Sequence, residues 1–203
     1  MQVKVCGLST VEQVNACIEC GADFCGFILN YPNSHRFISL EKAKQLTNIK
    51  KKKSKYVGVL VNPSFEELEI FSKLNLDYFQ LYGNYTNKDI TKIKKKFKKK
   101  IIFSIQVKKK SDIMKYKDIE KTADIILWDS SGLEQSLNWN YNWISSVSKN
   151  IIKMIAGNIN SDKLKEVSKL ANIVDVSGAL ETNKVKDIIK IKKFLNEVKL
   201  LND

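Results

Sequence analysis

Residues 3–29 read VKVCGLSTVEQVNACIECGADFCGFIL, and this stretch sets the pattern of the whole chain. The short apolar run Val3–Cys6 predicts a β-strand. Thr10–Cys20 then carries apolar residues at helical spacing, and Gly21 follows as a helix terminator. The next apolar run, Phe24–Leu29, predicts a second strand. A strand, a helix and another strand in this order are typical of parallel α/β structure.

The same alternation continues to the end of the chain, giving eight strand–helix repeats. We therefore predict an α/β fold, a single-domain (β/α)8 TIM barrel spanning residues 1–203. The first strand is not followed by a G-x-G-x-x-G sequence, which argues against an open dinucleotide-binding sheet. The further strands are predicted at Tyr56–Val61, Asp77–Leu81, Ile101–Val107, Asp124–Trp128, Ile151–Ala156 and Ile173–Val176. The further helices are predicted at Leu40–Lys53, Ser64–Leu74, Asn87–Lys100, Asp112–Lys121, Tyr141–Lys149, Ser161–Leu170 and Lys184–Leu200.

The charge of the chain is strongly basic, with 35 Lys and Arg against 22 Asp and Glu and a net charge of +13. Arg36 is the only arginine, so the excess is almost all lysine. We interpret the lysine runs as solvated helix surface, with no specific nucleic-acid partner. Such a surface still attracts anionic substrates at long range, and RNA nonspecifically. A lone guanidinium in this background marks Arg36 as a candidate ligand for a carboxylate or phosphate.

The sequence gives little indication of a metal site or of a membrane-spanning segment. Cys17 and Cys20 form a C-x-x-C pair, but no second pair follows and His35 is the only histidine. We therefore expect no metal site. The N-terminal residues lack the apolar core of a signal peptide, and no apolar run approaches 18 residues. We expect a cytoplasmic protein with reduced cysteines and no membrane partner.

Reactive groups in such barrels lie at the carboxyl ends of the strands. There, Cys6 and Asp129 form a candidate base and acid pair. The alternatives are a small buried hydrophobe for Cys6 and a turn or capping residue for Asp129. Lys4 shares a strand face with Cys6, and Asp175 on the neighbouring eighth strand is its candidate partner. Alternatively, Lys4 extends out of the bottom of the barrel.

A phosphate site is expected in the loops after the seventh and eighth strands, where small residues let the backbone approach an anion. Gly157 and Asn158 lie in the first of these loops, and Ser177, Gly178 and Ala179 lie in the second. The alternative is a pair of ordinary strand-to-helix turns.

Seven segments, in order along nearly the whole chain, each match a known sequence pattern. The first is Lys4-Val5-Cys6-Gly7-Leu8, which matches K-[IV]-C-G-[IL]. The others are Gly21–Phe27 (G-A-D-x-x-G-F), Ser34–Arg36 (S-x-R), Val57–Asn62 (V-G-V-F-V-N), Leu76–Gly83 (L-D-x-x-Q-L-H-G), Ile155–Asn160 (L-A-G-G-[IL]-N) and Val174–Glu181 (V-D-V-S-S-G-V-E). In these segments the chain resembles the phosphoribosylanthranilate isomerase family.

The resemblance implies an Amadori rearrangement of N-(5'-phosphoribosyl)anthranilate to 1-(2-carboxyphenylamino)-1-deoxy-D-ribulose 5-phosphate in tryptophan biosynthesis. It implies Asp129 as the general acid, Cys6 as the general base and Arg36 as the ligand of the anthranilate carboxylate. The matching fourth-strand segment adds Gln80 and Tyr82 as substrate-binding candidates. The phosphorylated substrate is a small molecule, and no metal or organic cofactor is implied.

The chain departs from the family pattern around the substrate. Tyr82 replaces a histidine, Asn158 replaces a glycine, and Ser177-Gly178-Ala179 replaces S-S-G. After the sixth strand, Ser131-Gly132-Leu133-Glu134 stands where the family has G-G-[ST]-G. From these changes we predict weaker phosphate binding, and hence a raised KM more than a lowered kcat.

Two alternatives to the isomerase remain open. One is another phosphosugar isomerase or epimerase. The other is a degenerate, non-catalytic, lysine-rich barrel that binds RNA or acts as a scaffold. The sequence leaves open whether the protein is a monomer or a homodimer.

Overall fold

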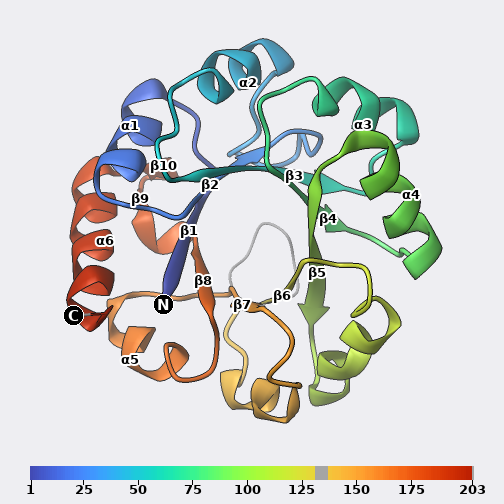
Figure 1. The fold of residues 1–203 in the computed structure, drawn as a ribbon. Helices are drawn as coiled ribbons and strands as arrows, with labels where there is room; N and C mark the ends of the chain where they lie inside the picture. The colour runs from blue at the N-terminus through green and yellow to red at the C-terminus, as the bar shows by residue number, and fades with distance from the viewer. Residues whose placement is uncertain (131–136, 203) are drawn as a thin grey trace.

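Eight parallel strands pair in chain order, and β1 also pairs with β8, so the sheet closes into a barrel (Figure 1). The structure is a computed structural model that describes residues 1–130 and 137–202. The predicted (β/α)8 fold is confirmed. The strands of the barrel are β1 (Gln2–Cys6), β2 (Phe24–Ile28), β3 (Lys55–Val61), β4 (Tyr78–Tyr82), β5 (Lys100–Val107), β6 (Ile125–Ser130), β7 (Lys153–Ile155) and β8 (Ile173–Val176).

Helices surround the barrel, and local sequence explains where several of them begin. Thr10, Ser64 and Thr86 start α1, α3 and α4 with capping boxes, in which the side chain of the third helical residue returns to the cap backbone. The helices are α1 (Val11–Glu19), α2 (Leu40–Thr47), α3 (Phe65–Ser72), α4 (Asn87–Phe97), α5 (Leu164–Val167) and α6 (Ile188–Asn202).

The helices predicted after β5 and β6 are 3-10 helices instead, at Lys110–Asp118 and Tyr141–Ser146. In the first, the carboxylate of Asp112 accepts hydrogen bonds from the backbone N–H groups of Lys108 and Lys109. The indole of Trp128 donates to the carbonyl of Ile113 at 3.1 Å. The Asp112 contacts cap the start of this segment, and the Trp128 contact binds to β6 a carbonyl that an α-helix would use internally. The predicted helix at 161–170 is similarly short, with a 3-10 turn at Ser161–Lys163 before α5.

A small hairpin precedes the last helix, where the sequence predicted helix from residue 184. The hairpin pairs β9 (Glu181–Thr182) with β10 (Val185–Lys186), after a 3-10 turn at Gly178–Leu180. Asn183 and Lys184 both have positive φ, at 52° and 63°, as a two-residue hairpin turn requires. The helix therefore begins at Ile188, and Glu181 is brought over the end of the barrel.

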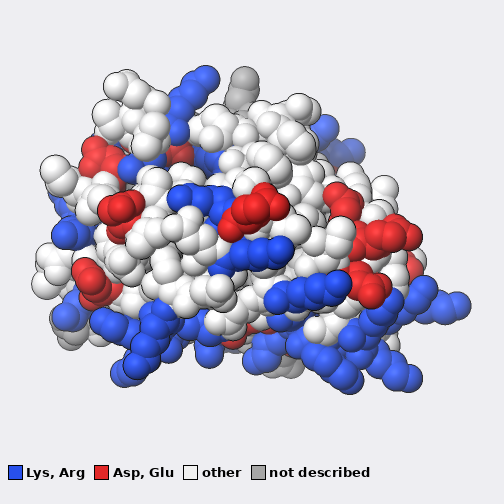
Figure 2. Space-filling view, turned by 90° about the horizontal axis from the view of Figure 1, so that it is seen from above, with Lys and Arg blue, Asp and Glu red and all other residues white. Residues whose placement is uncertain are grey.

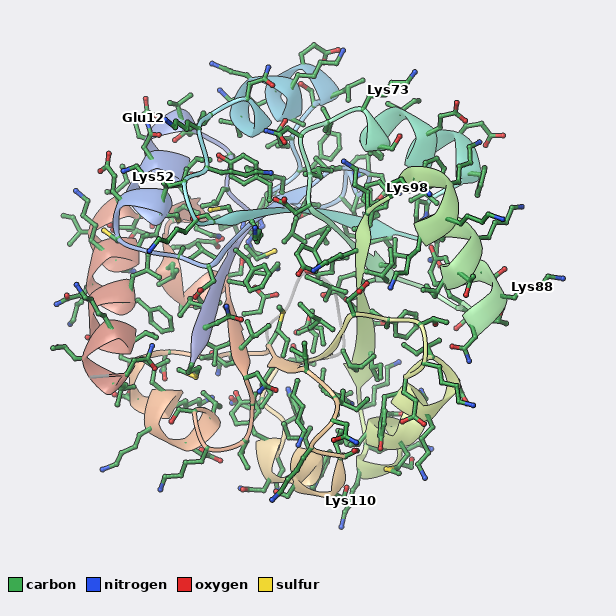
Figure 3. The ribbon with its side chains drawn as sticks, in the orientation of Figure 1. Glu12, Lys52, Lys73, Lys88, Lys98 and Lys110 are labelled. Atoms are coloured by element: carbon green, nitrogen blue, oxygen red, sulfur yellow. The ribbon has the colours of Figure 1, made fainter. Side chains whose placement is uncertain are left out.

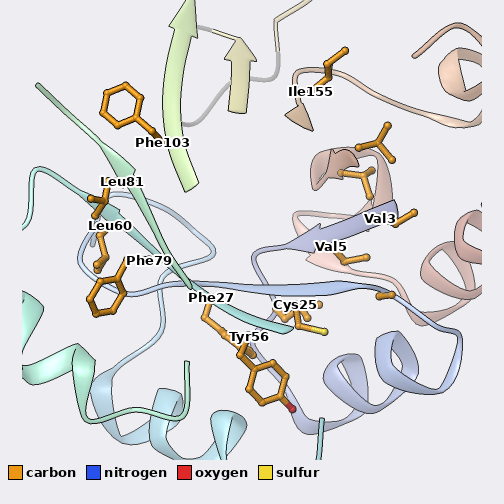
Figure 4. Close-up of a cluster of buried hydrophobic side chains, with 14 of the residues drawn as sticks. Val3, Val5, Cys25, Phe27, Tyr56, Leu60, Phe79, Leu81, Phe103 and Ile155 are labelled. Atoms are coloured by element: carbon orange, nitrogen blue, oxygen red, sulfur yellow. The ribbon is translucent and has the colours of Figure 1, made fainter. Parts of the chain in front are cut away.

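Alternation along the strands divides the core into two parts. Outward side chains pack between the sheet and the helices, and Figure 4 shows part of this layer, including Val5, Phe27 and Tyr56. Inward side chains fill the barrel, with an apolar layer at its amino-terminal end that includes Phe24 and Leu127. Above that layer the inward positions turn polar, and these polar residues form the site.

Much of the lysine excess lies on the surface of the barrel. In Figure 2, which shows the molecule from above, Lys and Arg gather along the lower edge of the view, and Asp and Glu lie mostly above them. Lys73, Lys88 and Lys110 point away from the ring of helices (Figure 3). This distribution agrees with the interpretation of the lysine runs as solvated surface.

Candidate active site

A pocket opens at the carboxyl ends of the strands and holds about 720 Å³ of space, part of it open to solvent. All but one of the predicted site residues line it: Cys6, Arg36, Tyr82, Asp129, Gly157, Asn158, Ser177, Gly178 and Ala179. The exception is Gln80, which is 1% exposed and lies behind Tyr82, where its side-chain N–H donates to the phenol oxygen at 3.2 Å. Gln80 therefore does not line the pocket, and its part in substrate binding stays a prediction.

Cys6 ends β1 with its side chain inside the pocket, next to Gly26 of β2. A Cβ at residue 26 would lie 3.0 Å from the Cys6 sulfur and 3.2 Å from Cε of Lys4. The missing side chain therefore leaves room for both residues. Burial raises the pKa of the Cys6 thiol, and the ammonium of Lys4 opposes that rise. A thiol acts as a base more readily when its pKa is lowered, and here only the charge of Lys4 works in that direction.

Lys4 is completely buried and forms an ion pair with Asp175, with 2.8 Å between Nζ and Oδ2. The two residues are register partners across β1 and β8. The predicted pairing is confirmed, and the alternative, in which Lys4 extends out of the barrel, is wrong. Burial alone would lower the pKa of Lys4, but Asp175 and then Cys6 raise it above its ordinary value, so the ammonium stays charged beneath the thiol.

Asp129 projects into the pocket near the end of β6. The hydroxyl of Tyr82 donates to its Oδ2 at 2.7 Å, and the backbone N–H of Ser130 donates to its Oδ1 at 2.7 Å. Burial raises the pKa of Asp129 to about 6, and these hydrogen bonds limit the rise. A carboxyl group with a pKa near neutrality suits a general acid.

Arg36 lies over Gly7, and its guanidinium is bound in a fork by Glu181. Nε donates to Oε1 at 2.6 Å, and Nη2 donates to Oε2 at 3.0 Å. Gly7 has φ +79°, and a Cβ there would lie 2.5 Å from Cδ of Arg36, so only glycine leaves space for the arginine stem. The sequence placed Arg36 in the site but missed Glu181 as its partner, although Glu181 stands in a segment that resembles the family.

The predicted phosphate loops form the wall of the pocket next to β7 and β8. Gly157 and Asn158 adopt positive φ values of 100° and 48°. The Ser177 hydroxyl donates to the Cys6 carbonyl at 3.0 Å and accepts from Nζ of Lys186 at 3.2 Å. Lys186 is buried and also pairs with Glu181. The predicted weak cradle at Ser131–Glu134 lies outside the described residues.

An apolar wall on the β2 and β3 side was missed by the sequence argument. Ile28, Tyr31, Val59 and Val61 line the pocket there, and Ile159 does so opposite. From the sequence, only the alternation of side chains along β3 could have indicated that these valines face the barrel interior. The wall gives the pocket a surface suited to a flat aromatic ring.

The comparisons with known proteins agree with this geometry. Residues 3–197 match the family model described as N-(5'-phosphoribosyl)anthranilate (PRA) isomerase. The chain belongs to the phosphoribosylanthranilate isomerase family. The isomerase of Streptococcus mutans is 37% identical over 203 residues, covering 98% of each chain.

Two solved structures are also similar over 98% of each chain. One is a phosphoribosylanthranilate isomerase in complex with reduced 1-(o-carboxyphenylamino)-1-deoxyribulose 5-phosphate, with a TM-score of 0.85 and 26% identity. The other is described as monomers of the dimeric isomerase from Thermotoga maritima, with a TM-score of 0.85 and 25% identity.

These matches confirm the predicted fold and family, and with them the assignment as an isomerase enzyme of tryptophan biosynthesis. Within residues 1–130 and 137–202, no helix is long and apolar enough to cross a membrane. The same residues contain no group of three His, Cys, Asp or Glu side chains placed to hold a metal ion.

Proposed function

We propose that this chain converts N-(5'-phosphoribosyl)anthranilate to the carboxyphenylamino-deoxyribulose phosphate within one barrel domain, residues 1–203. Asp129 is the general acid and Cys6 the general base. The observation that carries the proposal is their shared pocket, in which a carboxyl with a pKa of about 6 faces the same space as a thiol next to a buried ammonium.

The first step needs a proton donor and leaves a charge on the protein. Asp129 transfers its proton to the ribose ring oxygen while the bond from that oxygen to C1 breaks. The nitrogen lone pair forms a C=N bond to C1, which gives a protonated Schiff base. Hydrogen bonds from Tyr82 and the Ser130 backbone then stabilise the Asp129 carboxylate.

The second step needs a base on C2. The Cys6 thiolate removes the C2 proton, and the electrons of that C–H bond form the C1=C2 bond of an enolamine. Tautomerisation, in which C1 gains a proton and the C2 hydroxyl loses one, gives the ketone. Proton exchange with solvent then removes the proton from the Cys6 thiol and restores the one on Asp129. Lys4 favours the thiolate because its charged ammonium lies beneath the sulfur.

The rest of the pocket supplies binding. Arg36, fixed by Glu181, places positive charge where the anthranilate carboxylate binds, and the apolar wall takes the aromatic ring. Gly157, Asn158, Ser177, Gly178 and Ala179 contact the phosphate. Tyr82 borders the ribose through its ring. These site assignments follow the pocket lining and the resemblance of the segments, and no cofactor or metal takes part.

We also propose a cytoplasmic location and either a monomer or a homodimer, since one similar isomerase is described as dimeric. Sedimentation of the purified protein at micromolar concentration distinguishes the two oligomeric states.

The test is turnover of freshly generated phosphoribosylanthranilate, followed by loss of anthranilate-type fluorescence, with the product identified by mass. The reduced product found in the similar complex serves as a binding probe. Turnover to the ribulose phosphate and competitive inhibition by the reduced product support the proposal. Folded protein that neither turns over the substrate nor binds the reduced product contradicts it. Other sugar phosphates and RNA would then be tried.

A further inference from the structure

Tyr82 stands where the family segment L-D-x-x-Q-L-H-G has histidine, and its hydroxyl points at the proposed acid. We propose that Tyr82 is a positioning residue that stabilises the carboxylate which Asp129 becomes when it protonates the substrate. The inference rests on the proposed function, because it assigns Tyr82 a part in that same proton transfer.

Three side chains form a directed chain of hydrogen bonds across the barrel interior. Gln80 Nε2 donates to the Tyr82 hydroxyl at 3.2 Å, and that hydroxyl donates to Asp129 Oδ2 at 2.7 Å. Gln80 and Tyr82 are 1% and 8% exposed, so water competes little for these contacts. A donor bound to the tyrosine oxygen polarises its O–H bond and makes it a stronger donor to the carboxylate.

The phenol acts as a donor and not as an acid. Burial, followed by the negative charge of Asp129, raises the pKa of Tyr82 well above its ordinary value. The hydroxyl therefore keeps its proton throughout the catalytic pH range. Because Tyr82 Oη and the Ser130 N–H both donate to Asp129, each favours the charged form over the neutral acid.

The charged and titratable groups around Asp129 and Tyr82 come from several elements of the barrel. Asp175 on β8 raises the pKa of Asp129 and Lys4 on β1 lowers it. Cys6 on β1 affects Tyr82, and Tyr141, in the 3-10 helix after β6, is affected by Asp129. Tyr82 on β4 differs from these groups because its hydroxyl donates a hydrogen bond directly to the Asp129 carboxylate.

Loss of the Tyr82 hydroxyl has two opposing effects on kcat/KM. Because one of them depends on pH, the pH profile distinguishes this role of Tyr82 from a structural one. Without this donor, the pKa of Asp129 rises by roughly one unit. The acid is then weaker, so the proton transfer itself slows, on the order of threefold for a Brønsted dependence near one half. Above the pKa, however, a roughly tenfold larger share of Asp129 carries the proton that the reaction needs.

The experiment measures kcat/KM from pH 5 to pH 9 for the native protein, Tyr82→Phe and the control Tyr85→Phe. The control removes the hydroxyl of a nearby tyrosine that does not contact Asp129. Freshly generated substrate is used, and uncatalysed decay is subtracted at each pH. A second variant places 3-fluorotyrosine at position 82, which makes the phenol a stronger donor.

We expect the inflection of the kcat/KM profile near pH 6 to shift to a pH about one unit higher in Tyr82→Phe. With 3-fluorotyrosine at position 82, the inflection should shift to a lower pH. The ratio of variant to native kcat/KM should therefore rise about tenfold between pH 5 and pH 8 for Tyr82→Phe. The Tyr85→Phe profile should keep its native limb. A merely structural role lowers the rate by the same factor at every pH and would overturn the inference.

A titration without substrate separates this inference from the proposed function. The Asp129 carboxyl is followed by carbon-detected NMR against pH in the native protein and in Tyr82→Phe, with assignment by Asp129→Asn. An upward move of its midpoint supports the link to Tyr82, and an unchanged midpoint overturns it, whether or not turnover is seen. Absence of turnover in the native protein rejects the proposed function on its own.

Discussion

Replacing Lys4 with methionine removes a buried charge while keeping an unbranched side chain in its place. Lys4 is 0% exposed and Asp175 is 7% exposed, and their ion pair measures 2.8 Å. Oδ1 of Asp175 has no hydrogen-bond partner among the described residues. The ion pair with Lys4 is therefore the main interaction that stabilises the buried Asp175 carboxylate. Breaking one side of such a buried pair costs about 3–5 kcal/mol of unfolding free energy.

The same change acts on the thiol of Cys6. Lys4 lowers its pKa and Asp175 raises it, so losing the ammonium raises the thiol pKa further. Asp175 will partly neutralise itself by taking up a proton, which limits this further rise in the thiol pKa. At pH 8 the thiolate fraction and the alkylation rate of Cys6 should therefore fall, on the order of tenfold.

Alkylation by iodoacetamide, resolved by peptide mass, measures this rate, and urea unfolding measures stability. Lys51→Met is the matched control, since Lys51 forms a 2.8 Å pair with Asp77 that is about a quarter exposed and worth about 1 kcal/mol at most. The double variant Lys4→Met with Asp175→Asn should regain stability but not native thiol reactivity. A folded Lys4→Met protein whose Cys6 reacts at the native rate would refute the reasoning.

Three further changes test other parts of the site. Gly7→Ala should cost about 1–2 kcal/mol and raise KM, because φ is +79° and the new Cβ displaces Arg36; native KM in steady-state assays would contradict this. Arg36→Lys should raise KM on the order of tenfold with a smaller change in kcat, since an ammonium cannot replace the fork on Glu181. Asp129→Asn should be more stable than the native protein by about 1–3 kcal/mol at pH 8, but not at pH 4. Burial raises the pKa of Asp129 from 3.8 to about 6, so the native fold loses stability as pH rises through this window. Equal differences in urea unfolding at both pH values would count against that assignment.

The fold was predictable because strand and helix periodicity are local properties. Every barrel strand lies where an apolar run predicted it, and capping residues such as Ser64 mark helix starts in the sequence. The 3-10 helix at Lys110–Asp118 was missed because it depends on the distant indole of Trp128. The β9–β10 hairpin was missed because Asn183 is followed by lysine and not by the usual glycine.

Part of the site could be predicted from two features of the sequence: which residues end a strand, and which alternate residues of a strand face the barrel interior. These placed Cys6 and Asp129 in one pocket, and adjacency of the first and last strands paired Lys4 with Asp175. Beyond this pairing of neighbouring strands, the sequence did not identify the partners of polar side chains. It gave no sign that Tyr82 would bind Asp129, or that burial would outweigh the charge of Lys4 and raise the thiol pKa.

The central claim is that Asp129 and Cys6 exchange protons with the bound substrate. The most direct test is single-turnover kinetics with freshly generated phosphoribosylanthranilate and excess enzyme, comparing the native protein with Cys6→Ser and Asp129→Asn. The account predicts that both variants bind the reduced product with near-native affinity but react at least about 100-fold more slowly. Native single-turnover rates in either variant would contradict the assignment of that residue to the chemistry.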